Sequence, residues 1–159
     1  MRAYHGTSSK VLEAILLGRK TKPRRVFIEN NVSLGGTYVT ERRNLAEVYA
    51  EQAARVLGGR PIVLELDLDE AELQPDEDWV VDAAEGRDEP PTRIQKFLDD
   101  VFVGYLGEGF SLSDHYKKRY TKLNAKHRVT WRDSWQWRGT ARLPRPLRAS
   151  DIRSESAAS

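Results

Sequence analysis

The residue types best suited to chemistry stand in the first third of the chain. His5 precedes Gly6 in the run Tyr-His-Gly-Thr-Ser, and Tyr38 follows a pair of glycines that ends with Gly36. A second tyrosine, Tyr49, stands eleven positions after Tyr38. Glycines permit close backbone approach to a ligand, and a tyrosine at a strand edge offers a flat stacking face. Taken alone, the stretch from Gly36 to Tyr49 indicates a strand, a turn and a helix that carry two aromatic side chains.

The surrounding pattern predicts short strands alternating with helices. Ser8 or Ser9 can cap a helix whose apolar residues run from 11 to 16, and Gly58 can end a second helix at 44–56. Residues 62–68 open apolar and then alternate, which is typical of a strand. We expect further strands at 2–5, 37–40, 127–131, 135–138 and 140–143, and further helices at 92–106 and 111–124. Residues 26–28 fit a brief strand or a loop over a ligand. The mixture predicts an α+β domain.

Length and composition narrow the class of protein. The 159 residues fit one domain, which we place at residues 1–153, followed by a flexible tail at 154–159. The chain has no cysteine, and its three histidines are not spaced as a metal-binding motif, so we expect no metal centre. No apolar run reaches the ~20 residues that span a bilayer, and no signal peptide is evident. We expect a monomeric cytoplasmic protein without a membrane partner.

Charge is distributed unevenly although its net value is only +2. A basic stretch runs from Arg19 to Arg25, residues 67–89 are mostly acidic, and residues 117–153 are basic again. Such asymmetry is typical of proteins with an anionic partner, for example a nucleotide or a nucleic acid. We interpret the acidic residues 76–89 as a solvated surface loop.

The first third of the chain resembles the signatures of the ADP-ribosyltransferase fold in its histidine branch. That branch includes the catalytic domain of poly(ADP-ribose) polymerases and the diphtheria-toxin-like enzymes. His5-Gly6-Thr7 resembles the first signature, and the glycine-led strand with Tyr38 resembles the second. Tyr49 corresponds to the second stacking tyrosine of the family. The resemblance implies a split antiparallel β-sheet core with flanking helices and NAD as co-substrate.

In such a site the carboxamide of nicotinamide pairs with a backbone N–H and C=O, and Gly6 would let the backbone come close enough. The two tyrosines would stack on the pyridinium ring, and Thr7 or Ser8 would bind ribose together with His5. Arg25 or a neighbouring basic residue would neutralise the diphosphate. The implied NAD-binding residues are His5, Gly6, Thr7, Ser8, Arg25, Gly36, Tyr38 and Tyr49.

The third signature of the family is a residue at the start of a late strand, commonly glutamate. The expected strand at 135–138 places Gln136 there, so the implied catalytic residues are His5, Tyr38 and Gln136. Asp133 is the alternative if the strand begins earlier, and Glu108 is a more remote candidate. Glutamine can bind a ribose hydroxyl but cannot act as a base.

The resemblance implies an NAD-dependent mono-ADP-ribosyltransferase, a pentosyl-transferring enzyme that modifies a protein or a nucleic acid. The small size is similar to that of stand-alone bacterial or phage effectors and toxins. Two alternatives stay open. A non-catalytic NAD- or ADP-ribose-binding module is favoured by Gln136, whereas an RNA 2′-phosphotransferase-like enzyme is disfavoured by the paired tyrosines.

Overall fold

The structure is a computed structural model that describes residues 1–19, 35–78, 89–105 and 114–159. Arg25, Glu108 and the segment 26–28 lie outside the described residues. In the described ranges no helix is long and apolar enough to cross a bilayer.

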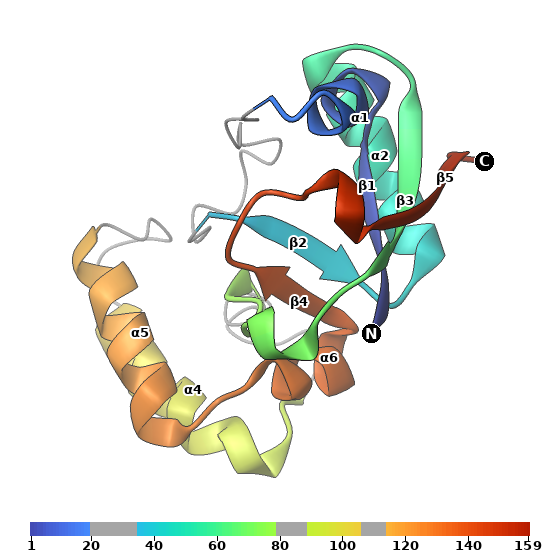
Figure 1. The fold of residues 1–159 in the computed structure, drawn as a ribbon. Coiled ribbons are helices and arrows are strands. Elements are labelled where there is room, and N and C mark those ends of the chain that lie inside the picture. The colour runs from blue at the N-terminus through green and yellow to red at the C-terminus, as the bar shows by residue number, and fades with distance from the viewer. Residues whose placement is uncertain (20–34, 79–88, 106–113) are drawn as a thin grey trace.

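Five antiparallel strands form one sheet in the order β4-β2-β1-β3-β5. The strands are β1 (Arg2–Ser8), β2 (Thr37–Thr40), β3 (Pro61–Asp67), β4 (Thr140–Leu143) and β5 (Ile152–Ala157). β1 pairs with β3 along its whole length, from Arg2↔Asp67 to Ser8↔Pro61. β1 and β2 share only the pair Tyr4↔Thr40. Figure 1 shows the result: β2 and β4 cross the direction of β1, β3 and β5 at a steep angle.

Helices pack on the sheet, and further helices continue the fold beyond one side of it. They are α1 (Ser9–Leu16), α2 (Arg43–Leu57), α4 (Thr92–Tyr105), α5 (Asp114–His127) and α6 (Trp131–Arg138), with short 3-10 turns η1 (Glu70–Glu72) and η2 (Ala149–Asp151). α2 lies across β1 and β3, where Ala46 and Ala50 are fully buried against Val63. Ser8 caps α1, because its Oγ accepts a hydrogen bond from the Val11 amide at 3.4 Å.

Besides the cluster of Ala46, Ala50 and Val63, two larger hydrophobic clusters lie in the described part of the chain. The larger one lies against the sheet and contains Val39, Leu64, Leu66 and Leu143, all at most 1% exposed. The smaller one joins α4 to α5 through residues such as Phe97, whose ring meets that of Tyr120 edge to face at 5.8 Å. The predicted α+β class is confirmed.

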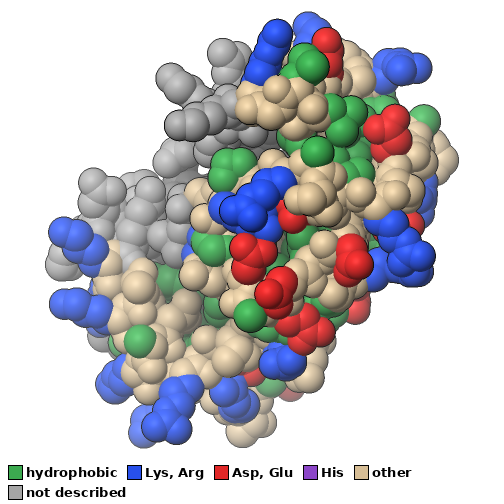
Figure 2. All heavy atoms as spheres, in the orientation of Figure 1, with side chains coloured by type: hydrophobic (Ala, Val, Ile, Leu, Met, Phe, Trp, Pro, Cys, Tyr) green, Lys and Arg blue, Asp and Glu red, His purple; other side chains and the backbone are tan. Residues whose placement is uncertain are grey.

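The helical part carries the excess of positive charge. Residues 92–138 contain ten Lys and Arg against five Asp and Glu. On α5 the side chains of Lys118, Arg119, Lys122 and Lys126 are exposed. Figure 2 shows Lys and Arg along the edge formed by α4 and α5, whereas Asp and Glu gather in the middle of the same face.

The strands predicted at 127–131 and 135–138 were wrong. α5 ends at His127, and α6 occupies Trp131–Arg138. The Thr130 backbone N–H donates to Asp133 Oδ2 at 2.7 Å, which forms a capping box and starts the helix. Trp131 and Trp135 stand one turn apart and pack edge to face at 6.1 Å. Aromatic residues at every second position therefore belong here to a helix, since a spacing of four also fits its period.

Two further segments differ from the sequence prediction. Residues 154–157, expected in a flexible tail, belong to β5, which pairs with β3 from Ile62↔Ala157 to Leu66↔Ile152. Asp76 and Glu77, expected in a solvated loop, are 7% and 0% exposed. This second difference places a buried carboxylate where the sequence predicted none.

Candidate functional site

The backbone of β1 turns the polar groups of Gly6 toward β2. In an antiparallel strand the N–H and C=O of successive residues point alternately to the two neighbouring strands. The Leu68 amide donates to the Met1 carbonyl and the Ser9 amide to the Arg60 carbonyl, both at 2.9 Å. Odd-numbered residues of β1 therefore face β3, and Gly6 faces β2.

The same alternation of backbone groups along β2 turns the carbonyl of Tyr38 toward β1. The Glu41 amide donates to the Gly139 carbonyl at 2.9 Å, so odd-numbered residues of β2 face β4. A continued ladder would pair Tyr38 with Gly6, but the strands pair only at Tyr4↔Thr40 and diverge beyond it. The carbonyl of Tyr38 lies instead 2.8 Å from Nδ1 of His5. The histidine ring thus donates the hydrogen bond that a backbone amide of β1 would donate in a regular sheet. The N–H and C=O of Gly6 then point into the space where β1 and β2 separate.

This contact fixes the state of the His5 ring. A carbonyl oxygen only accepts hydrogen bonds, so Nδ1 carries the proton and donates it. Burial lowers the pKa of His5 from 6.5 to about 4, and the ring is therefore neutral near pH 7. In this tautomer Nε2 has a free lone pair and can accept a hydrogen bond from a hydroxyl group.

Gly6 also determines where Tyr49 lies. A Cβ atom at residue 6 would stand 1.9 Å from the Ala46 carbonyl oxygen and 2.9 Å from Cβ of Tyr49. Only glycine therefore permits α2 to pack directly on β1. The sequence analysis assigned Gly6 to the close approach of a ligand. In the structure the missing Cβ makes room for α2, and the backbone N–H and C=O of Gly6 face β2.

Both tyrosines of the predicted site lie on the α2 side of the sheet. Side chains alternate between the two faces of a strand, and Tyr4, which packs against the buried alanines of α2, has the parity of Gly6. Thr40 pairs with Tyr4, so Tyr38 shares this face as well. The fold thus brings Tyr49 against Gly6 from α2, and it places Tyr38 on the same face of the adjacent strand β2.

The hydroxyl of Tyr38 is held by the buried Glu77, to which it donates a hydrogen bond. Oε2 of the same carboxylate lies 3.1 Å from Nε of Arg142 in an ion pair. Arg142 is 7% exposed and pairs with Tyr38 across the β2–β4 ladder. Tyr38, Glu77 and Arg142 therefore form one buried polar network on the α2 side of the sheet.

The rest of the network anchors the segment that carries Glu77. Arg142 donates through Nη1 to the Gly35 carbonyl at 3.0 Å and through Nη2 to the side chain of Gln74. The backbones of Gln74 and Arg142 exchange two hydrogen bonds of 2.8 and 2.9 Å. The Asp76 amide donates to Ser134 Oγ at 3.2 Å. Residues 74–76 are thus attached to both β4 and α6, which fixes the neighbouring Glu77.

The candidates for the third signature do not occupy such a position. Gln136 was assigned to a strand, but it lies on α6 with its side chain exposed. Asp133 caps that helix and forms an ion pair with Arg93. The late strand that pairs with β2 is β4, and it places Arg142 opposite Tyr38. Gln136 was chosen because it was expected on a late strand, and the structure has a helix there.

The remaining predicted residues fall into two groups. Thr7 and Ser8 are 3% and 0% exposed, and the Ser8 hydroxyl serves as the helix cap. Gly36 has φ 102°, and a Cβ there would stand 2.2 Å from the Leu143 carbonyl oxygen, so the close approach of β4 requires glycine. Sequence reasoning missed Glu77 and Arg142. The available signal was an acidic triplet between Leu73 and the apolar residues 79–81.

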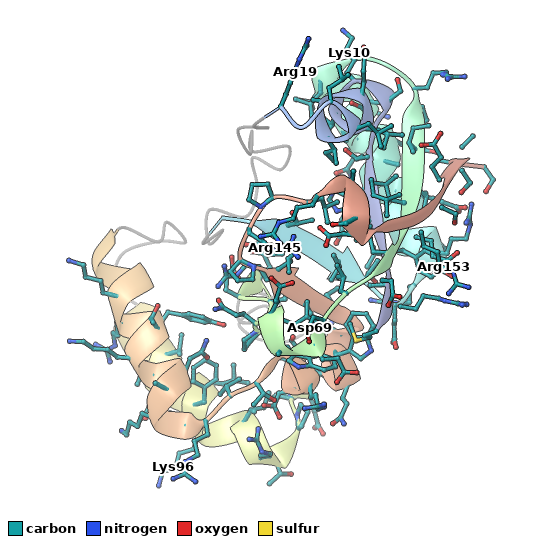
Figure 3. The ribbon with its side chains drawn as sticks, in the orientation of Figure 1. Lys10, Arg19, Asp69, Lys96, Arg145 and Arg153 are labelled. Atoms are coloured by element: carbon teal, nitrogen blue, oxygen red, sulfur yellow. The ribbon has the colours of Figure 1, made fainter. Side chains whose placement is uncertain are left out.

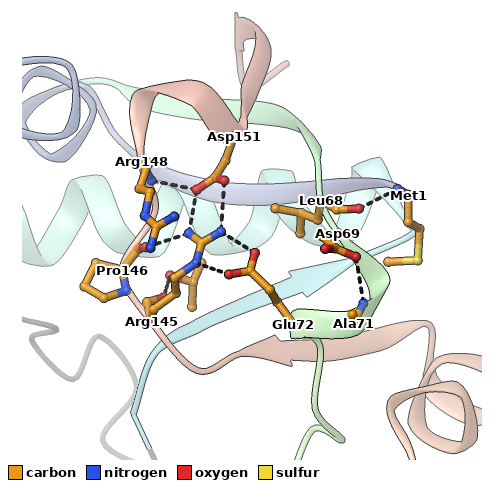
Figure 4. Close-up of polar contacts among 10 residues, drawn as sticks. Met1, Leu68, Asp69, Ala71, Glu72, Arg145, Pro146, Arg148 and Asp151 are labelled. Atoms are coloured by element: carbon orange, nitrogen blue, oxygen red, sulfur yellow. Dashed lines mark hydrogen bonds and ion pairs between the residues drawn. The ribbon is translucent and has the colours of Figure 1, made fainter.

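A second cluster of charges lies close by along the chain and serves as a contrast. The guanidinium of Arg145 spans Glu72 at 2.6 Å and Asp151 at 2.8 Å, and thereby joins η1 to η2 (Figures 3 and 4). These partners raise the pKa of Arg145, and its hydrogen bond lowers the pKa of Glu72. Burial alone would raise the pKa of Asp151, but the hydrogen bonds from Arg145 and the Arg148 amide outweigh it and lower that pKa.

No group of three or more metal-ligating side chains is present in the described ranges. Comparison of the chain with protein-family models, with curated proteins and with solved structures finds no match in any of the three. A functional assignment therefore depends on the geometry of the residues around Gly6.

Proposed function

We propose that the chain is an NAD-dependent ADP-ribosyltransferase that releases nicotinamide and transfers a single ADP-ribose to a macromolecular acceptor. One observation carries this proposal: His5 takes the carbonyl of Tyr38, and the N–H and C=O of Gly6 face the resulting divergence of the strands. A backbone donor and acceptor on one residue, with a tyrosine on the adjacent strand and another on α2, are complementary to a flat primary carboxamide.

Nicotinamide fits this arrangement through both of its parts. Its carboxamide can donate to the Gly6 carbonyl and accept from the Gly6 amide, and we propose that the ring then stacks between Tyr38 and Tyr49. The cationic pyridinium then gains cation–π attraction from the tyrosine faces. Nε2 of His5 can accept a hydrogen bond from a ribose hydroxyl and thereby orient the sugar relative to the ring.

The proposed reaction breaks the bond between nicotinamide nitrogen and ribose C1′. Its electron pair moves onto the pyridinium and yields neutral nicotinamide, while C1′ acquires oxocarbenium character. A nucleophile of the acceptor then bonds to C1′ and loses its proton to solvent or to a base. Catalysis of this kind depends mainly on orientation and on electrostatic support.

The acceptor can be a protein or a nucleic acid, and the charge distribution favours a polyanion. A groove of about 720 Å³ lies between α5 and the segment of Glu70, Ala71 and Leu73 to Pro75, and α5 also carries exposed basic side chains. Thr121, Asn124 and Arg128 line the helical side of this groove. A helix with exposed basic side chains suits a phosphate backbone, because the charges attract it without reading its sequence.

The proposal is tested by incubating the protein with NAD and quantifying nicotinamide by chromatography, with and without protein or nucleic-acid acceptors. Tyr38→Ala and His5→Ala should each reduce release by about 100-fold, as expected when orientation of the reacting ring is lost. Arg153→Ala, an exposed change on β5, is the matched control and should leave release unchanged.

Each alternative function has its own outcome in this experiment. Binding of NAD without release under any condition would indicate a non-catalytic binding module. Release that occurs only with an RNA carrying an internal 2′-phosphate would indicate a phosphotransferase. Absence of both binding and release would refute the proposal.

A further inference from the structure

Glu77 is a fully buried carboxylate that the proposed reaction does not consume. We infer that it is a positioning residue, which holds the ring of Tyr38 and makes that ring selective for a cationic ligand over a neutral one. This inference rests on the proposed function, since Tyr38 is there one of the two stacking residues. It concerns specificity, and it assigns Glu77 no proton transfer to or from the substrate.

The contacts of Glu77 identify its charge state and its target. A carboxylate at 0% exposure is costly unless it is paired and hydrogen-bonded. Arg142 supplies the opposite charge at 3.1 Å, which favours the ionised form. An ionised carboxylate only accepts hydrogen bonds, so the proton between the two groups belongs to the Tyr38 hydroxyl, which donates it.

This hydrogen bond fixes the tyrosine at both ends. The backbone of Tyr38 is held in the β2–β4 ladder, and its hydroxyl is held by a carboxylate that is itself attached to Arg142. A ring restrained in this way loses little conformational freedom when a ligand stacks on it. Pre-organisation of this kind strengthens binding without a new contact.

The same hydrogen bond changes the electronic character of the ring. A phenol that donates to a carboxylate shifts toward phenolate, and the negative potential over its face increases. Cation–π attraction depends on that potential, so the gain applies to the pyridinium of NAD and not to neutral nicotinamide. The site would then hold the ring before bond cleavage and release it afterward, which favours turnover.

Two substitutions isolate this effect. Tyr38→Phe keeps the ring and the Glu77–Arg142 ion pair but removes the hydrogen bond, and Glu77→Gln removes the negative charge at nearly constant size. Binding of NAD and of nicotinamide is measured separately by calorimetry. We expect each substitution to weaken NAD binding about tenfold and nicotinamide binding less than about twofold, because only the first ligand carries the ring charge.

Glu72→Gln is the matched control, since Glu72 pairs with Arg145 on the same stretch of chain. It should change neither affinity. If Glu77→Gln fails to fold, Tyr38→Phe still decides the matter, because it leaves the buried ion pair in place. Equal weakening of both ligands, or of neither, would refute the role of Glu77 while leaving the proposed function intact. Failure of the native protein to bind NAD would refute both.

Discussion

Arg142 and Arg145 lie three positions apart and tie the same stretch of chain to the sheet, but their surroundings differ. The side chains of Arg142 and Glu77 are 9% and 0% exposed, whereas those of Arg145 and Glu72 are 16% and 37% exposed. Glu77 contacts the predicted stacking residue Tyr38, whereas Glu72 and Asp151 belong to two 3-10 turns. Figure 3 shows Arg145 near the centre of the face that β2 and β4 present.

The difference teaches how to separate a structural ion pair from a functional one. Burial of two charges costs about as much free energy as their attraction returns, so a buried pair is weak evidence for stability. A partly exposed bidentate pair such as Arg145 with Glu72 joins two turns at modest cost. The buried pair at Arg142 therefore needs a second explanation, and its contact with Tyr38 offers one.

The largest effect is expected when each arginine is replaced by methionine. Arg142→Met leaves the charge of Glu77 buried without its cation, which should lower the free energy of unfolding by roughly 3–5 kcal/mol. Arg145→Met leaves Glu72 partly exposed to water and leaves the buried Asp151 with its hydrogen bond from the Arg148 amide, so it should cost less than Arg142→Met. Urea unfolding of both variants gives the comparison. Equal losses in the free energy of unfolding would show that the buried pair and the partly exposed pair contribute equally to stability.

Lowering the pH should destabilise the two regions in different pH ranges: the region around His5 first, and the Arg145 cluster at lower pH. Because burial lowers the pKa of His5 to about 4, the unfolded chain takes up a proton first, and stability falls as the pH drops from 6.5 toward 4. Between pH 7 and pH 5 this amounts to about 2 kcal/mol. The lowered pKa values of Glu72 and Asp151 act in a lower window, where the unfolded carboxylates become protonated.

Thermal unfolding at several pH values tests this order. His5→Gln should remove the loss between pH 7 and pH 5 but keep the loss at lower pH. Glu72→Gln should keep the loss between pH 7 and pH 5 and reduce the loss at lower pH, to which Asp151 still contributes. A loss between pH 7 and pH 5 that persists in His5→Gln would mean that another group titrates there.

The smallest effect is expected on α5, where Lys118 and Lys122 are exposed. Replacing Lys118 and Lys122 together by glutamine should lower the modification of a nucleic-acid acceptor about threefold at low salt and less at high salt, because exposed charges are screened. Nicotinamide release without an acceptor should not change. Lys10 on α1, far from α5 in Figure 3, is the control position. An equal effect of Lys10→Gln would argue against binding along α5.

Local signals were sufficient for the elements that surround Gly6. Ser8 or Ser9 was predicted as a helix cap, residues 44–56 as a helix and 62–68 as a strand. The structure has Ser8 as the cap, α2 at Arg43–Leu57 and β3 at Pro61–Asp67. Each prediction depended on residues within one turn or one strand. Periodicity failed at Trp135, where a spacing of two concealed a helix that Thr130 and Asp133 begin.

The network at Tyr38 could not be predicted in this way. Glu77 is buried because Arg142 and Tyr38, both distant in sequence, meet it through the pairing of β2 with β4. The acidic triplet and the apolar residues 79–81 beside Glu77 are a local signal, but they do not identify its partners Tyr38 and Arg142. The same holds for His5, whose bond to the Tyr38 carbonyl exists only because two strands diverge after one pair.

The single pair Tyr4↔Thr40 makes the seam between β1 and β2 the weakest line of the sheet that the structure describes. A carboxamide bound to Gly6 would add hydrogen bonds beside that pair and would connect the β1 side of the sheet to the β2 side. Binding would then stiffen the seam, and cleavage of the ligand would loosen it again. In such a protein the substrate is, for the length of one turnover, a part of the fold.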